Sequence, residues 1–157
     1  MAYRGYFTAE ELLTEVNALF PFVAKPPDVQ LTLQGDEDLC SRYLREDMRR
    51  FVAPKLPPDG VRYLCSELAE LSGQGMRWLF PSLLRVLLVR EGRADELSYF
   101  VVCDLSGSAS RLDSIRLRYG WLDTEQIACL QSLLEYCSEI YGHEVAQAQK
   151  TLDSLRD

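Results

Sequence analysis

The sequence has little of what metal-dependent or nucleophilic chemistry requires. Its one histidine is His143, and none of its five cysteines belongs to a C-x-x-C pair. A metal site needs several donors at ligand spacing, so we expect neither a metal nor a cofactor. The nine glycines are scattered, and residues 106–110 lack the second glycine and the preceding buried strand of a serine nucleophile elbow. These absences predict that the protein is not an enzyme.

A long apolar run and an excess of basic charge are also missing. The most apolar stretch, residues 78–89, contains Pro81, Ser82 and Arg85 and is too short to span a bilayer. Charged residues interrupt residues 1–20, which leaves no apolar core for a signal peptide. The net charge of -7 opposes non-specific binding to phosphates. We therefore expect a cytoplasmic protein that binds neither a membrane nor nucleic acid directly.

The sequence contains enough apolar material for one folded domain. Its 157 residues are 47% hydrophobic and 26% charged, the usual balance of a globular protein. Apolar residues recur mostly at helical spacing, which predicts a single all-α domain, residues 1–157, with about six helices. At most one short strand is expected, within residues 29–34 or 97–102. Residues 94–105 are rich in β-branched and aromatic side chains, so helix and strand compete there, and the helical flanks favour a helix.

Several helices can be predicted in detail. Thr8 and Glu11 have the spacing of a capping box, and residues 76–89 are apolar on nearly all sides, as a central helix would be. Pro81 predicts either a kink there or a true start near Phe80. Residues 36–51 form a second helix, whose expected buried stripe is Leu39, Tyr43, Leu44, Met48 and Phe51.

The most regular apolar pattern lies near the carboxyl end of the chain. Thr124 is the expected cap of a helix with a stripe at three- and four-residue steps, formed by Ile127, Leu130, Leu134, Cys137 and Tyr141. Gly142 provides a left-handed exit, and His143 begins a last helix with an exposed ring. All the cysteines fall within apolar patterns, which is typical of buried, reduced thiols; we expect this of Cys65, Cys103 and Cys137 in particular, with no disulfide.

Acidic residues are concentrated in the same region. Residues 121–157 contain seven acidic and two basic side chains, and the outward side of the predicted helix should present part of this charge. Such a surface attracts a basic partner through long-range electrostatics. The candidate partner-binding residues are Trp121, Asp123, Glu125, Glu135 and Glu139, with a second acidic cluster at Asp36, Glu37 and Asp38.

Two short motifs carry a family resemblance. The first is Trp78-Leu79-Phe80-Pro81 with Leu83 and Leu84; the second is Trp121-Leu122-Asp123-Thr124-Glu125-Gln126, followed by Leu130, Leu133, Leu134 and Tyr136. Over residues 76–142 the chain resembles an uncharacterised family of small bacterial all-helical proteins. The resemblance implies a helical fold of bacterial origin and transfers no catalytic residue.

In size, charge and lack of chemical motifs the chain is also similar to bacterial immunity proteins, which neutralise the toxin of a type VI or contact-dependent secretion system. This is an analogy of general character. It implies a protein partner, a cognate effector toxin such as a nuclease, whose active site the acidic surface occludes. A helical adaptor or chaperone-like module with an exposed apolar groove is the alternative. An enzyme of unfamiliar type, working through carboxylate pairs, is a third hypothesis.

Overall fold

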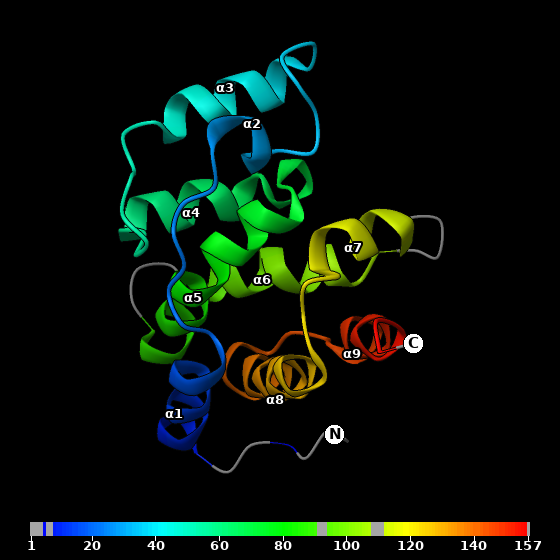
Figure 1. Ribbon diagram of the computed structural model, residues 1–157. Helices are drawn as coiled ribbons and strands as arrows, with labels where there is room; N and C mark the ends of the chain where they lie inside the picture. The colour runs from blue at the N-terminus through cyan, green and yellow to red at the C-terminus, as the bar shows by residue number, and fades with distance from the viewer. Residues whose placement is uncertain (1–4, 6–7, 91–93, 108–111, 157) are drawn as a thin grey trace.

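The computed structural model describes residues 5, 8–90, 94–107 and 112–156, which are all-α as predicted (Figure 1). This part of the chain has nine α-helices, where about six were expected, and its only β pairing is an isolated bridge between Thr32 and Leu71. One cluster of buried apolar side chains extends from Leu12 to Leu152. The elements are α1 (Ala9–Leu19), α2 (Asp28–Leu31), α3 (Leu39–Met48), α4 (Pro58–Ser66), the 3₁₀ turn η1 (Leu68–Glu70), α5 (Gly73–Val89), α6 (Ala94–Leu105), α7 (Leu112–Tyr119), α8 (Thr124–Tyr141) and α9 (Ala146–Ser154).

Helix α5 is the central element, as its apolar sequence predicts. Eleven of its 17 residues are buried, and α1, α2, α4, α6 and α7 all pack against it. The helix begins at Gly73, where the Ser72 hydroxyl accepts a hydrogen bond from the Gly75 amide. It continues through Pro81 to Val89, so the predicted start near Phe80 is wrong. Packing on every side holds the helix together across the proline, which would break an isolated helix.

Two glycines allow neighbouring elements to approach α5 closely. A Cβ atom on Gly75 would overlap the carbonyl oxygen of Leu31 at the end of α2. A Cβ atom on Gly73 would lie 2.8 Å from the carbonyl oxygen of Leu117 in α7. The start of α5 therefore lies between α2 and α7, and a larger side chain at either glycine would push one of them away.

Residues 29–34, one of the two places where a short strand was expected, are only partly extended. Its first half belongs to the four-residue helix α2, in which Leu31 is buried and Val29 is exposed. Its second half pairs with the chain after η1: the Ser72 amide donates to Leu31 O at 3.1 Å, and the Leu33 amide donates to Glu70 O at 3.0 Å. The alternating pattern thus marks a bridge of one residue pair rather than a strand.

Helix α3 buries a different side from the one predicted. Its buried residues are Ser41, Leu44, Arg45 and Met48, at steps of three, one and three. The predicted stripe included Leu39 and Tyr43, each of which is 54% exposed. The stripe is rotated because Arg45, which reads as a surface residue, lies against the fold and pairs with Asp36.

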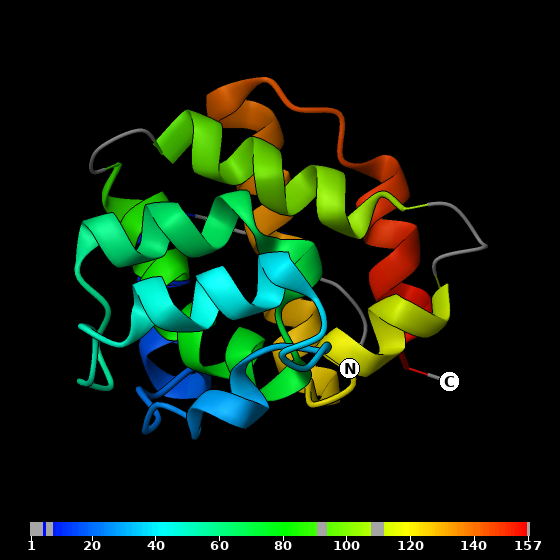
Figure 2. The ribbon, with the colours of Figure 1, turned by 90° about the horizontal axis from the view of Figure 1, so that it is seen from above.

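The carboxyl-terminal half follows the predictions with two differences. Residues 94–105 are helical, as expected. Helix α7 was not predicted, and α8 is capped by Asp123, whose side chain accepts from the Gln126 amide in a full capping box, rather than by Thr124. Gly142 has the expected left-handed conformation, φ 75°. Helices α8 and α9 lie side by side at one end of the molecule, and α3 lies at the other end (Figures 1 and 2).

The cysteines are all free thiols, as predicted, but two of them are not buried. Cys65, Cys129 and Cys137 lie in the core, whereas Cys40 and Cys103 are exposed. The prediction for Cys103 is therefore wrong. The residues around it in α6, Val101 and Val102, are buried, and Cys103 follows them on the outer side of the helix. In a continuous apolar run, the sequence pattern does not indicate which side chains are exposed.

Truncation of a leucine on the buried stripe of α8 should be strongly destabilising. Leu130 and Leu134 are almost completely buried, so Leu130→Ala or Leu134→Ala should lower the free energy of unfolding by about 2–5 kcal/mol. Leu117→Ala is the matched control, because Leu117 is 68% exposed and its truncation should cost less than about 0.5 kcal/mol. Urea denaturation of the three variants measures the differences. Equal losses for Leu134→Ala and Leu117→Ala would contradict this packing.

The buried thiols should make the fold sensitive to alkaline pH. Burial raises the pKa of Cys137 from 9.0 to about 12, and burial together with the charge of Glu15 does the same for Cys129. Above pH 9 the unfolded chain loses these protons while the folded chain keeps them. The stabilisation is therefore complete below about pH 9 and is lost as the pH rises toward 12, by up to about 1.4 kcal/mol per pH unit for each thiol.

Urea titrations at a series of pH values between 8 and 11 measure this loss. Cys137→Ala should make the decline shallower, because the buried thiol no longer titrates. Cys40→Ala should leave the decline as it is, since that thiol is exposed. An unfolding free energy that stays level across this range would contradict the burial of the thiols.

Candidate functional site

The predicted outward acidic side of α8 is largely covered. Cys129, Gln131 and Ser132 are buried together with the apolar stripe. Ser132 Oγ donates to Gly5 O at 2.8 Å, and Gln131 Nε2 donates to the carboxylate of Asp153 in α9 at 2.7 Å. The prediction that α8 presents one open acidic face is wrong in its middle, because α1, α9 and Gly5 cover that part of the helix.

The candidate residues on α8 therefore lie at its two ends. Asp123 and Glu125 are exposed at the first turn, and Glu139 is exposed near the last. Glu125 and Glu139 are 14 positions apart, which is roughly 21 Å along a helix. Glu135, between them, is half-buried, and its Oε2 is buried without a hydrogen-bond partner among the described residues. These carboxylates do not form one continuous surface on α8.

Trp121 is part of the packing around α5. Its ring meets Phe20 and Phe80 edge to face, at centroid distances of 6.3 and 5.8 Å. Its Nε1 donates to Arg118 O at 2.9 Å. The indole is half-buried, so only part of it is available to a partner. Packing and hydrogen bonding account for its position without a ligand.

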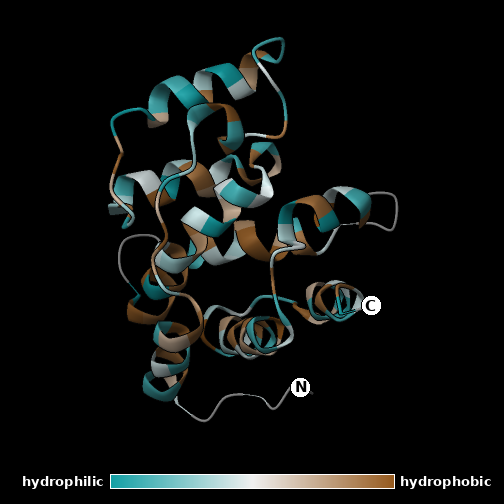
Figure 3. Cartoon of the chain, in the orientation of Figure 1, coloured by the Kyte–Doolittle hydropathy of each residue, from teal (hydrophilic) through white to brown (hydrophobic). Residues whose placement is uncertain are grey.

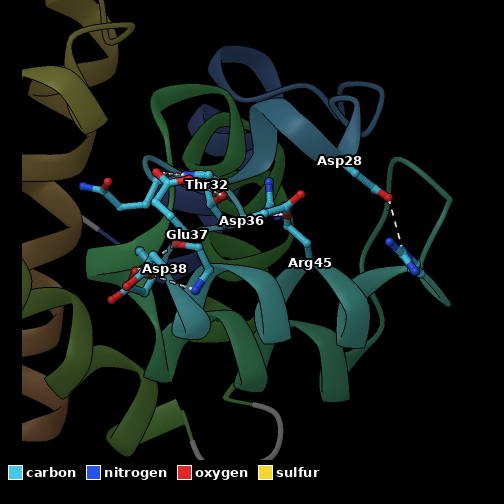
Figure 4. Close-up of polar contacts among 11 residues, drawn as sticks. Asp28, Thr32, Asp36, Glu37, Asp38 and Arg45 are labelled. Atoms are coloured by element: carbon cyan, nitrogen blue, oxygen red, sulfur yellow. Dashed lines mark hydrogen bonds and ion pairs between the residues drawn. The ribbon is translucent and has the colours of Figure 1, made fainter.

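The second acidic cluster is at the opposite end of the molecule, beside α3 (Figures 1 and 4). Asp36 pairs with Arg45, and Glu37 Oε1 accepts from the Gly35 amide at 3.2 Å. Asp38 caps α3 by accepting from the Ser41 amide at 2.9 Å, and its bonds with Ser41 lower the pKa of Asp38. Each carboxylate thus has a local structural partner, and the eight predicted site residues do not meet in one place.

The sequence reasoning did not connect the acidic residues of α1 with α8. The two helices pack against each other, and Gln126 Nε2 at the start of α8 donates to Leu19 O at the end of α1. Glu10, Glu11 and Glu15 are exposed on α1, and neither helix contains a lysine or arginine. We call the set Glu10, Glu11, Glu15 and Glu125 the α1–α8 acidic surface. The acidic residues of each helix can be read from the sequence. The contact between two helices more than 100 residues apart cannot.

Among the residues that the structure describes, no hydrogen bond or ion pair holds the carboxylates of this surface. The Thr8 hydroxyl accepts from the Glu11 amide at 3.1 Å, which is one half of the predicted capping box. The Thr8 amide does not donate the return bond to the Glu11 carboxylate, and the described residues offer no ion pair to Glu10, Glu11, Glu15 or Glu125. Glu11 and Glu15 stand four residues apart, a spacing at which like charges repel and weaken the helix.

His143 is neither exposed nor at a helix start. It is half-buried between α8 and α9, where its ring lies near Tyr99 and Tyr141. Its Nε2 is 2.6 Å from Ser98 Oγ and 3.2 Å from Asp95 O. Because the Ser98 hydroxyl donates to Asp95 O, it accepts from an Nε2–H of the ring. Ser98 is fully buried, so this serine–histidine pair fastens the segment after α8 to α6 and offers no nucleophile to a substrate.

A buried charged cluster joins α6, α7 and η1. Asp104 Oδ2 accepts from Arg118 Nη1 at 2.7 Å and from the Tyr119 hydroxyl at 2.5 Å. Arg118 Nη1 also donates to Leu68 O at 3.2 Å. The side chains of Arg118 and Asp104 are 0% and 5% exposed. This isolation from solvent identifies a structural ion pair rather than a substrate site.

The surroundings of this cluster shift two pKa values. Burial and the neighbouring carboxylate of Asp104 raise the pKa of Tyr119 well above 10. Burial alone would lower the pKa of Arg118, but the bond and charge of Asp104 raise it. Sequence reasoning missed the cluster, although Arg118 stands three residues after Ile115 and directly before Tyr119, on the buried side of α7. A charged residue at a core-facing position was the available signal.

Comparisons with known proteins give no relative for this chain. It matches no protein-family model, no curated protein and no solved structure. The resemblance of residues 76–142 to a bacterial helical family therefore stays a prediction. Within the described residues, no helix combines the length and apolar character required to cross a membrane, and no group of three or more His, Cys, Asp or Glu side chains could hold a metal ion.

Removal of one member of the buried pair should cost more than removal of both. Arg118→Met leaves Asp104 as an uncompensated buried charge and should destabilise the fold by about 3–5 kcal/mol. Arg118→Met combined with Asp104→Leu should recover part of this loss, because neither charge then remains in the core. Arg116→Met is the control on the exposed side of α7 and should change stability by less than about 0.5 kcal/mol. Urea denaturation provides all three values; additive losses in the double variant would contradict the pairing.

Proposed function

We propose that the protein binds a basic protein partner through the α1–α8 acidic surface. The observation that carries this proposal is that four exposed carboxylates lie on two packed helices that contain no basic residue. Several other acidic residues cap a helix or pair with an arginine, whereas these four have no such partner among the described residues. Complementary charge accelerates association and selects against acidic partners.

The most specific form of this proposal is an immunity protein that occludes the active site of a cognate bacterial toxin. A nuclease toxin must hold phosphates in a basic active site, which an acidic helical surface can cover. In this proposal the toxin is an effector of a type VI or contact-dependent secretion system, and the immunity protein acts in the cytoplasm. The analogy with such proteins in size, charge and lack of catalytic motifs supports this form, and the resemblance of residues 76–142 to a bacterial helical family agrees with it.

Charge reversal on α1 separates binding from folding. Glu15→Lys removes the repulsion with Glu11 and creates a favourable pair four residues apart, so it should stabilise the protein by about 0.5 kcal/mol. The same change should weaken association with a basic partner, mainly through a slower on-rate at low salt. If the role of Glu15 were purely structural, the variant would not gain stability and lose affinity for the partner at the same time.

Co-expression with the product of the adjacent gene, followed by affinity capture and surface plasmon resonance, is the measurement. Glu46→Lys on the exposed side of α3 is the matched control, since it makes the same charge change at the other end of the molecule. We expect Glu15→Lys to slow association and Glu46→Lys to have a much smaller effect. Equal effects of the two variants, or a protein that stays alone despite co-expression, would contradict the proposal.

A further inference from the structure

A pocket of about 470 Å³ lies between the last turns of α5, the start of α4 and the chain that follows α1. Its walls are mainly apolar and are formed by Phe22, Leu56, Pro57, Val86 and Val89. This volume falls within the ~300–1,000 Å³ of small-molecule sites, which are mostly apolar with a few convergent polar groups. The two prolines that begin α4 and the burial of Leu56 make this wall rigid.

Arg85 brings a fixed positive charge to the pocket. Its Nε donates to Asn17 Oδ1 at 2.9 Å, and its Nη1 donates to Phe20 O at 3.0 Å and to Pro81 O at 2.6 Å. The guanidinium also lies 4.3 Å from the centroid of the Phe22 ring. All of these partners are neutral, and Nη2 has no hydrogen-bond partner among the described residues. The guanidinium stays protonated at neutral pH, so its charge is held in place with no acidic partner among the described residues.

Lys55 adds a second positive charge at the same pocket. Its side chain is exposed and belongs to no ion pair in the described part of the chain. None of the described residues that line the pocket is acidic. In a protein of net charge -7, two cations beside an apolar cavity, neither paired with an acidic side chain among the described residues, select for an anion.

The donors of the pocket fit a carboxylate better than a phosphate. Phosphate sites rely on clusters of free backbone amides. Here the Leu56 amide already donates to Ser82 Oγ at 2.9 Å, and Pro57 and Pro58 have no amide hydrogen. One guanidinium nitrogen without a partner among the described residues and one exposed ammonium match the two oxygens of a single carboxylate.

We propose that this pocket binds a small amphipathic monocarboxylate, with its apolar body among Phe22, Leu56, Val86 and Val89 and its carboxylate at Arg85 Nη2 and Lys55 Nζ. This ligand site is separate from the α1–α8 acidic surface, and the proposal does not depend on the binding of a basic protein. Apolar burial supplies the attraction, while the two cations set the sign and orientation of the ligand.

Isothermal titration of the full-length protein with decanoate, below its micelle concentration, tests the site. We expect saturable binding of one decanoate per chain, at least about tenfold weaker binding of decanol and no binding of decylamine, because the charge of the head group decides recognition. Equal affinities for decanoate and decanol, or the absence of decanoate binding, would overturn the proposal. Tighter binding of a peptide with an apolar carboxyl-terminal residue than of decanoate would also overturn it, by assigning the pocket to a protein partner.

Two pairs of variants locate the binding in this pocket. Lys55→Glu should weaken decanoate binding about tenfold or more, whereas Lys150→Glu on α9 makes the same charge change elsewhere and should leave it unchanged. Val89→Trp should fill the pocket and abolish binding, whereas Val29→Trp adds the same side chain at an exposed position of α2. Thermal melts of each variant confirm folding. Equal effects within either pair would refute the assignment to this pocket.

Discussion

The burial of α5 on nearly all sides is the constraint on which the rest of the fold depends. A helix satisfies its own backbone hydrogen bonds, so it can lie in the core if its side chains are apolar and its neighbours cover it. Five helices do so, and glycines at positions 73 and 75 let α7 and α2 come close to its start. Figure 3 shows hydrophilic residues on outer elements such as α3.

Polar side chains of α5 connect the core to the two proposed binding sites, the apolar pocket and the α1–α8 acidic surface. Ser82 and Trp78 hold the segment before α4 through bonds to Leu56 N and Ala53 O, at 2.9 and 3.2 Å. Arg85 holds the end of α1 through Asn17 and Phe20. The same contacts build the walls and the charge of the apolar pocket, and they fix the orientation of α1 with its exposed glutamates. Arg85 therefore links the apolar pocket, which it lines, to α1, which carries the exposed glutamates.

Local sequence patterns could predict the helices but not their neighbours. The all-α class, the central position of α5, the buried stripe of α8 and the left-handed Gly142 follow from periodicity, apolar content and a glycine exit. Tertiary pairing decided the rest: Arg45 lies inside because Asp36 meets it, and α8 is covered because α1 and α9 flank it. The sequence therefore predicted the acidic character of the candidate site but not its position. The acidic residues of α1 are far in the sequence from the start of α8, and only the folded chain brings the two helices together.

Native-state hydrogen exchange tests the central role of α5 most directly. If every other element depends on this helix, its amides should exchange only when the whole protein unfolds, with an exchange free energy equal to the global free energy of unfolding. The amides of α3, which buries four residues and has an exposed outer side, should exchange through local opening at a lower free energy. Exchange from α5 as fast as from α3 would contradict the account, because it would mean that the core can open without the loss of the fold.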